Sequence, residues 1–351
     1  MKPFDKDKIA IVYLDESNLS EETYLDFLKQ YYGRSNWLRY QKKKEWYSSQ
    51  YPYRILLAIV NGLPVGQNCV YKVPAVIGGK DTTISWGVDA FVLPKWRGNG
   101  IGKMLQKRLH EDCENFSSAW YSPINGLIKR KCNANEYFRL YFPYYAVSKW
   151  FSIYIELAIK KLFNKTITIP IRIPNLYILF KTKSGEHFEF EEVYNFDDAD
   201  ISFINKVLSP KDLYVKRDVK YMHWKYFDNP SLLFPPHIVR VHYRNQLIAI
   251  FSFTTAKKSQ YISASVFTSI LFDSFIDDRY NFSNNDIIKY IVKYHKDQGV
   301  VIDGIRSLQD IKYYPKIVYP IYGVPLLSTY NGKLNSFYLS LIDQDMEQIA
   351  M

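Results

Sequence analysis

The clearest pattern of apolar and polar positions lies between Ile84 and Phe116. From Ile84 to Leu93 the residues alternate with a period of two, as in a half-buried strand. One face would carry Ile84, Trp86, Val88, Ala90 and Val92, and the other Ser85, Gly87, Asp89 and Phe91. Pro94 ends the strand. Apolar residues then recur every three or four positions, as in an amphipathic helix, at Ile101, Leu105, Leu109, Cys113 and Phe116. The pattern predicts a strand, a turn and a helix that begins within residues 97–102.

The turn between strand and helix is basic and rich in glycine, with the sequence RGNGIGK from Arg97 to Lys103. A helix N-terminus carries unpaired N–H groups and a partial positive charge, and glycines let these groups approach an anion closely. A dinucleotide-binding fingerprint and a P-loop both need other glycine spacings. The segment therefore predicts a pyrophosphate site, with a plain surface turn as the alternative.

The segments on either side predict a mixed α/β arrangement. IAIVYLD reads as a first strand, followed by a helix that Asn18 or Ser20 would cap and Gly33 would close. YRILLAIV and LPVGQNCVYKVPAVI would pair across Asn61-Gly62, the strongest short hairpin signal. Downstream, SSAWYSP predicts a further strand, and residues 125–141 predict a helix capped by Asn125.

The second half of the chain repeats features of the first. Trp46 is followed after five residues by Pro52, and Trp224 after five residues by Pro230. After each proline come an apolar strand, a short polar turn and a second apolar strand. Such repetition predicts two tandem copies of one fold, which we divide near residue 165 into domains 1–165 and 166–351.

The two copies differ at the glycine-rich turn. By topology, its counterpart in the second copy reads DDRYNFSNND and contains no glycine. The carboxylates of Asp277, Asp278 and Asp286 would repel a pyrophosphate. The second copy is therefore predicted to be degenerate and to bind no such ligand.

The turn resembles motif A of the GNAT acyltransferase superfamily. Arg97, Gly100 and Gly102 match the motif, and Val92 and Pro94 occupy their expected places. The resemblance implies tandem GNAT-like domains with mixed sheets, of which the first binds acyl-coenzyme A as co-substrate. It implies that the loop binds the pyrophosphate and that the strand backbone pairs with the pantetheine arm. The implied cofactor-binding residues are Phe91, Val92, Arg97, Gly98, Asn99, Gly100, Ile101, Gly102, Lys103 and Asn125.

In a GNAT-like site an amine attacks the thioester directly, so the protein must orient both partners and accept a proton. Asp89, beside the expected thioester position, is the candidate base. The alternatives are a purely structural Asp89 and a water chain. Tyr141, with Tyr137 behind it, is the candidate proton donor to the leaving thiolate. The usual Tyr followed by Gly-Phe in the family is missing here.

The acceptor is predicted from a looser resemblance. HWKYFDNP, the tandem arrangement and the ending FYLSLIDQD are similar to two-domain GNAT-type proteins of bacterial polysaccharide gene clusters. Some of these N-acylate nucleotide-linked amino sugars of the dTDP or UDP type, which is the reaction expected here. The alternatives are an amino acid, aminoacyl or protein amine as acceptor, or a non-catalytic acyl-coenzyme A module. The second domain would form one wall of the acceptor site, supported by the segments around Trp224 and Tyr226.

Composition adds limits to this picture. The net charge of +11 suits anionic ligands, and neither a nucleic-acid partner nor a membrane span is expected. Three cysteines without a Cys-x-x-Cys pair and six scattered histidines predict no metal site. Without a signal peptide or an apolar run of ~18 residues, a cytoplasmic location is expected. KWFSIYIELAIKKLFNK predicts a basic amphipathic helix that packs on a domain, with a membrane surface as the alternative.

Overall fold

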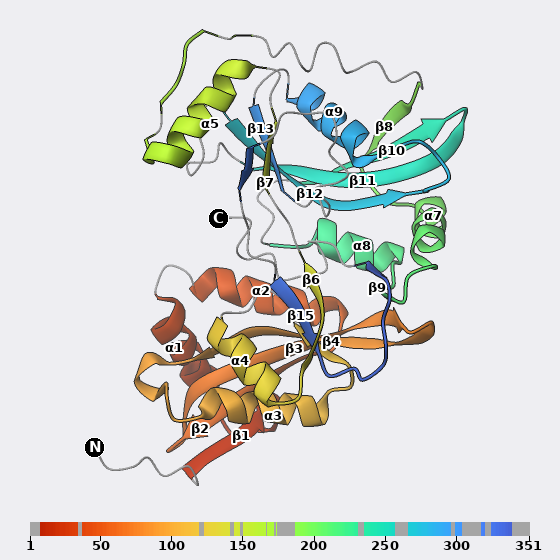
Figure 1. Ribbon diagram of the computed structural model, residues 1–351. Coiled ribbons are helices and arrows are strands. Elements are labelled where there is room, and N and C mark those ends of the chain that lie inside the picture. Colours follow the sequence, from red (N-terminus) through yellow and green to blue (C-terminus); the bar gives the residue numbers. More distant parts are fainter. Residues whose placement is uncertain are drawn as a thin grey trace.

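A computed structural model of the chain describes residues 8–33, 37–118, 123–140, 144–147, 150–165, 167–171, 173, 187–230, 235–256, 266–295, 299–303, 317–319 and 324–338. Two mixed sheets lie one above the other, each with helices around it (Figure 1). The elements of the first half are β1 (Ile9–Tyr13), α1 (Glu21–Tyr32), α2 (Trp37–Gln50), β2 (Tyr53–Val60), β3 (Leu63–Ile77), β4 (Lys80–Val92), α3 (Ile101–Asp112), β5 (Phe116–Ser118), α4 (Pro123–Lys131), β6 (Asn135–Leu140), β7 (Tyr144–Val147) and α5 (Phe151–Phe163).

The leading part of the second half follows the strand and helix order of the first half, with one strand added between its first two helices. Its elements are β8 (Glu189–Val193), α7 (Asp198–Leu208), β9 (Leu213–Val215), α8 (Val219–Tyr226), β10 (His237–Tyr243), β11 (Gln246–Ala256), β12 (Val266–Ile276), α9 (Asn284–Tyr294), β13 (Gly299–Asp303), β14 (Ile317–Tyr319), β15 (Val324–Ser328) and β16 (Phe337–Tyr338). β8, β10, β11 and β12 pair antiparallel in the way that β1, β2, β3 and β4 do, and both β12–β13 and β4–β5 are parallel. The predicted tandem fold is confirmed.

The local signals that predicted the first half hold in detail. The hairpin strands β2 and β3 have the predicted bounds, and Asn61 and Gly62 between them have φ values of 50° and 77°. The Ser20 hydroxyl caps α1 by accepting a hydrogen bond from the backbone N–H of Thr23 at 3.2 Å. Gly33 is the residue that follows the last turn of α1. These short-range signals sufficed because each one fixes the backbone within a few residues.

The two sheets exchange strands with each other, and β9 and β16 of the second half also join the first sheet through β3. β15, from the second half, lies between β5 and β6 of the first sheet, and β7, from the first half, lies between β13 and β14 of the second. Each sheet therefore needs a strand from the other half of the sequence. We keep the division near residue 165 as a proposal for the two repeats in the sequence. A cut at that position would remove β15 from the first sheet.

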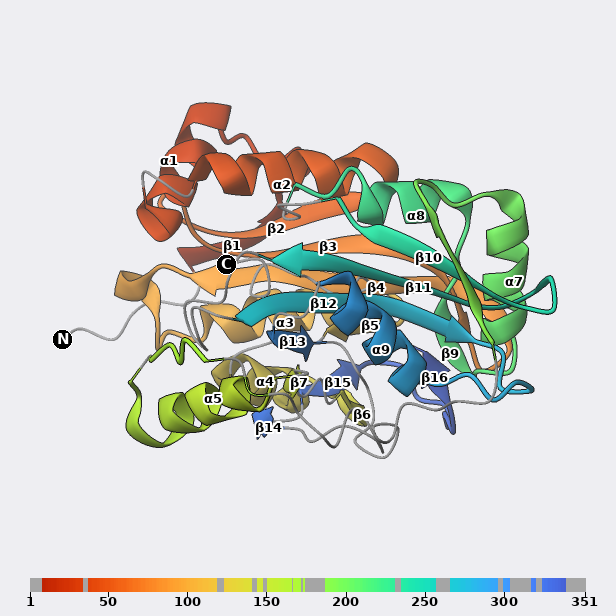
Figure 2. The same cartoon turned by 90° about the horizontal axis from the view of Figure 1, so that it is seen from above.

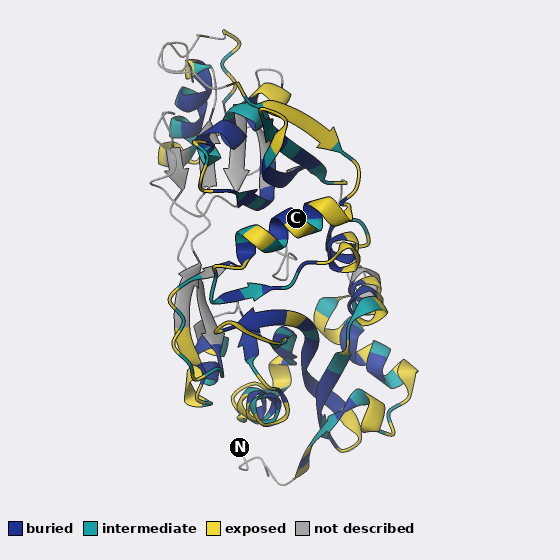
Figure 3. Ribbon diagram, turned by 90° about the vertical axis from the view of Figure 1, so that its right-hand side faces the viewer, coloured by how far each residue is buried: buried dark blue, intermediate teal, exposed yellow. Residues whose placement is uncertain are grey.

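A pair of equivalent tryptophans joins the two copies. The rings of Trp46 on α2 and Trp224 on α8 stack 4.7 Å apart, and each indole N–H donates to the backbone carbonyl of the other residue, at 2.9 and 2.8 Å. Trp224 is fully buried, and Tyr226 is 1% exposed. Both residues therefore lie in the shared core between the copies, and their support of an acceptor wall remains a proposal. Figure 3 shows this buried zone following the sheets and the inward side of α8.

The predicted helix over residues 125–141 is also wrong in its bounds. α4 begins at Pro123, so Asn125 lies inside the helix rather than at its cap, and it ends at Lys131. Asn133 then takes a left-handed φ of 64°, which stops the helix, and residues 135–140 form strand β6. Tyr137 therefore lies on a strand, while Tyr141 lies outside the described residues.

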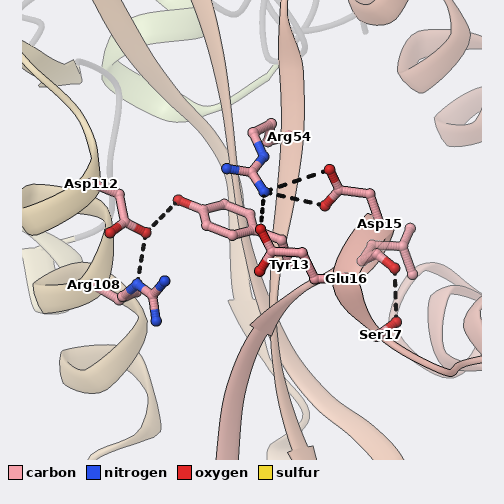
Figure 4. Close-up of polar contacts among 8 residues, drawn as sticks. Tyr13, Asp15, Glu16, Ser17, Arg54, Arg108 and Asp112 are labelled. Carbon is pink, nitrogen blue, oxygen red and sulfur yellow. Dashed lines mark hydrogen bonds and ion pairs between the residues drawn. The ribbon is translucent and has the colours of Figure 1, made fainter.

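A polar clamp fastens the end of β1 to the end of α3 (Figure 4). The hydroxyl of Tyr13 donates to Asp112 at 2.8 Å, and Arg108 donates to the same carboxylate at 2.7 Å. On the other side, the guanidinium of Arg54 lies 3.5 Å from the centre of the Tyr13 ring and donates to Glu16 at 2.5 Å. Burial, followed by the bond to Asp112, raises the pKa of Tyr13 above its usual range, so its hydroxyl stays a donor.

We expect Tyr13→Phe to lower the free energy of unfolding by about 1 to 2 kcal/mol, because it removes a hydrogen bond to a carboxylate from a buried ring. Urea denaturation measures the change. Tyr194→Phe is the matched control, since Tyr194 is 90% exposed. Equal midpoints for the two variants would show that the clamp adds nothing to stability.

Candidate functional site

The glycine-rich loop forms the N-terminus of α3, as predicted. Gly98 and Gly100 have φ values of 84° and 82°, in the left-handed region that favours glycine. A Cβ atom at either glycine would meet no other atom within 4 Å, so the space over the loop is open. The first turn of a helix leaves its N–H groups without helical partners, and here those groups border that open space. The loop can thus receive an anion.

The loop is braced against the sheet beneath it. A Cβ atom on Gly66 of β3 would lie 3.1 Å from Val92, 3.2 Å from the carbonyl of Phe91 and 3.3 Å from Ile101, so a side chain here would require these neighbours to shift. The side chain of Arg97 donates to the carbonyl of Val92 at 3.0 Å. Its guanidinium is thereby held at the junction of β4 and the loop. α4 packs alongside, where Ile128 would lie 3.4 Å from a Cβ on Gly102.

β4 separates from β5 beside this loop. Among the described residues, β4 pairs with β5 only through Ser85 and Trp86. No described strand pairs with the remaining edge of β4, from Gly87 to Val92, on that side. The backbone of Phe91 and Val92, which was predicted to pair with the pantetheine arm, lies on this stretch. The predicted cofactor-binding residues Phe91, Val92 and 97–103 are therefore neighbours, and Asn125 lies on the adjacent α4.

A bulge at Asp89 changes the faces of β4. Asp89 has a left-handed φ of 51°, and the register of β4 against β3 shifts between Gln67 and Cys69. Phe91 therefore joins Val88 in the core on the side of α1, while Val92 packs against the core under α3. The predicted alternation fails after Val88, because a bulge inserts one residue and exchanges the faces beyond it.

A buried amide holds this bulge in place. The side-chain amide of Gln67 donates to the carbonyl of Asp89 at 3.3 Å and to the hydroxyl of Tyr40 at 2.6 Å, and it accepts from the hydroxyl of Tyr24 at 3.0 Å. Gln67 is fully buried. Burial, followed by the charge of Asp89, raises the pKa of Tyr40 well above its usual range. Asp89 therefore lies among neutral tyrosine hydroxyls.

This cluster was missed in the sequence, although it left a signal. Gln67 and Asn68 are two adjacent polar residues inside a mostly apolar strand, and such residues are usually hydrogen-bonded when buried. Asn68 points to the other side of the sheet, where it donates to Gln106 of α3 at 3.2 Å. The two polar residues of this buried strand thus indicated hydrogen-bonded groups on both faces of the sheet.

Lys129 on α4 is a second group that the sequence did not single out. It is 3% exposed, and its ammonium donates to the hydroxyl of Ser118 on β5. Burial lowers the pKa of Lys129 to about 7. Between about pH 7 and the ordinary lysine pKa of about 10.4, Lys129 is therefore protonated in the unfolded chain and neutral in the folded protein. Stability should rise with pH across that window.

We expect Lys129→Met to stabilise the protein most at about pH 6, where the folded wild type carries a buried charge. The advantage should shrink by up to about 1.4 kcal/mol per pH unit as the pH rises above 7. Urea denaturation of both proteins from about pH 6 to pH 9 measures the difference. A difference that does not change with pH would show that Lys129 titrates normally.

Two further observations concern metal ions and membranes. In the part of the chain that the structure describes, no group of three or more His, Cys, Asp or Glu side chains is placed to hold a metal ion. None of the helices in that part has the length and apolar character needed to traverse a bilayer.

Comparisons with known proteins agree on the fold. No protein-family model matches the sequence. No curated protein matches it either. The solved structures that resemble the chain include the following three. A GCN5-related N-acetyltransferase from Anabaena variabilis has a TM-score of 0.56 and 11% identity over 91% of this chain and 72% of that one. A probable N-acyltransferase from Enterococcus faecalis has a TM-score of 0.55 and 11% identity over 91% of this chain and 71% of that one. Eis1 from Mycobacterium abscessus has a TM-score of 0.54 and 13% identity over 95% of this chain and 74% of that one. At these identities the likeness shows the GNAT fold alone.

Proposed function

We propose that this protein is an acyl-coenzyme A-dependent N-acyltransferase whose first copy holds the donor. The observation that carries the proposal is the open glycine loop at the start of α3. It lies beside the stretch of β4 from Gly87 to Val92, which contains Asp89 and which no described strand pairs on its β5 side. The helix N-terminus, Arg97 and Lys103 would bind the pyrophosphate. The edge of β4 offers backbone groups to the pantetheine arm, which would bring the thioester to the bulge.

The proposed reaction is a direct attack of the acceptor amine on the thioester carbon. The C–N bond forms, the C–S bond breaks, and coenzyme A leaves as a thiolate. Asp89 would take the proton from the ammonium before attack, and Tyr141 remains the proposed donor to the thiolate. The protein's main contribution is to hold the two partners in line.

The second copy is proposed to bind no coenzyme A, because its equivalent loop is already filled with its own carboxylates. Asp277 is bound by Arg279 at 2.5 and 2.8 Å, and this arrangement lowers the pKa of Asp277. At the start of α9, the backbone N–H of Ser283 donates to Asp286 at 3.1 Å, and the Ser283 hydroxyl donates to the same oxygen at 3.0 Å. An added pyrophosphate would meet negative charge there.

For the acceptor we propose a nucleotide-linked amino sugar of the dTDP or UDP type, in surface polysaccharide synthesis. The net charge of +11 and the 31 tyrosines support this choice, since basic groups attract diphosphates and aromatic rings stack on sugars. We propose a cytoplasmic location, where such donors and acceptors occur together. An amino acid, aminoacyl or protein amine is the competing acceptor class.

Release of free thiol from acetyl-coenzyme A tests the proposal against a panel of nucleotide amino sugars, amino acids and peptides. Release that depends on a nucleotide amino sugar supports the proposed reaction. Release only with amino acids or peptides would move the acceptor to the competing class. Binding of acetyl-coenzyme A without release for any acceptor would instead indicate a non-catalytic sensor.

A further inference from the structure

The helix α5 stands at the outer edge of the molecule and has two different faces (Figures 1 and 2). Ile153, Tyr154 and Leu157 are buried, so one face packs onto the protein as the sequence predicted. The opposite face is built from Phe151, Ile155, Ala158 and Leu162, at spacings of four, three and four residues, which place them in one stripe along the helix.

This outward stripe is apolar and open to solvent. Phe151 is 51% exposed at the start of the helix, and Leu162 and Phe163 are 74% and 66% exposed at its end. Ile155 and Ala158, between them, are half-buried. An amphipathic helix on a monomeric domain normally turns polar side chains to water on this side. The sequence of α5 instead supplies apolar residues on the outward face as well.

The segment after α5 adds a second apolar ridge beside the first. It runs back along the helix, since the N–H of Ile169 donates to Glu156 at 2.8 Å and the N–H of Phe151 donates to the carbonyl of Ile173 at 2.7 Å. Ile171 is 69% exposed and Ile173 is 46% exposed. Exposed apolar side chains gathered in this way mark an interaction site.

The segment that carries the two ridges is basic. The sequence from Phe151 to Ile173 contains Lys160, Lys161, Lys165 and Arg172. Its one acidic residue, Glu156, is 1% exposed and already accepts the N–H of Ile169. No negative side chain of this segment therefore faces solvent. Among the described side chains, Lys165 is exposed two residues after Phe163. An exposed apolar surface on a basic segment is complementary to an anionic lipid surface.

We propose that α5, residues 167–171 and Ile173 form a membrane-docking surface that binds anionic lipid headgroups and inserts its apolar ridges between them. The protein would then be attached to the surface of a bilayer without crossing it. Partial burial of several apolar side chains would combine with the attraction of the basic residues to give reversible binding. The proposal is independent of the proposed transferase reaction.

Vesicle co-sedimentation of the full chain tests the proposal, with phosphatidylcholine vesicles that contain or lack phosphatidylglycerol. We expect binding to the anionic vesicles, weakened by salt because part of it is electrostatic. The double variant Leu162→Gln, Phe163→Gln should lower the partition coefficient at least ~10-fold, the effect of losing about 1.4 kcal/mol. Leu63→Gln is the matched control, because Leu63 is 60% exposed at the distant β2–β3 turn and should bind as the wild type does.

Circular dichroism and thermal melting establish that each variant is folded, which we expect since the substituted side chains are exposed. Wild-type protein that does not sediment with anionic vesicles would overturn the proposal. So would equal binding by the double variant and the Leu63→Gln control. A wild-type dimer in light scattering that the double variant converts to a monomer, without vesicle binding, would assign the ridges to a contact between two copies instead.

Discussion

Replacing Gly100 with glutamate should abolish the thermal stabilisation that acetyl-coenzyme A gives to the protein. The open space over the loop is where the pyrophosphate is proposed to lie, and the new side chain would fill it with a carboxylate. A ligand at 100 times its dissociation constant stabilises by about 2.7 kcal/mol, all of which should be lost. The shift of melting temperature on adding acetyl-coenzyme A measures the effect.

The variant needs a control for backbone strain, because Gly100 has a left-handed φ of 82°. Gly62→Glu provides it, since Gly62 has a φ of 77° and also has nothing within 4 Å of an added Cβ. Both variants should lose about 1 kcal/mol of intrinsic stability, but only Gly100→Glu should lose the response to ligand. A full ligand response in folded Gly100→Glu would refute the loop as the pyrophosphate site.

Replacing Asp89 with asparagine should lower kcat by about 10²- to 10⁴-fold while affinity for acetyl-coenzyme A stays nearly unchanged. The substitution removes the charge and keeps the shape. Asparagine also tolerates the left-handed φ of 51° at this position, so the bulge should persist. Steady-state rates at saturating acceptor, with ligand-induced melting shifts, separate the two effects.

Asp89→Gly serves as a second variant, because it keeps the backbone conformation available and removes the whole side chain. Both variants should be slow to a similar degree if the carboxylate acts as base. If Asp89→Asn kept the wild-type kcat, Asp89 would have only a structural role in the bulge, and a water chain would be favoured as the proton acceptor.

Short-range features of this protein were readable in the sequence. The Asn61-Gly62 hairpin, the start of α3 within 97–102 and the repeated Trp46 and Trp224 segments were all predicted, and the structure has them. Each depends on a turn, a cap or a repeat that a few neighbouring residues determine. The open loop at Gly98 and Gly100 belongs to the same class, because glycine alone takes that backbone conformation easily.

The features that were missed depend on distant parts of the chain. The bulge at Asp89 is fixed by the amide of Gln67 on the neighbouring strand, and no alternation within β4 reveals it. The exchange of β7 and β15 between the sheets depends on which strands they pair with, and the sequences of the two strands do not determine these partners.

The central claim is that two copies of one fold provide a single coenzyme A site, in the first copy. Isothermal titration of the full chain with coenzyme A measures this most directly, because it counts the sites. The account predicts one site per chain, which disappears in Gly100→Glu. Two sites per chain, no site, or a single site that survives in folded Gly100→Glu would contradict it.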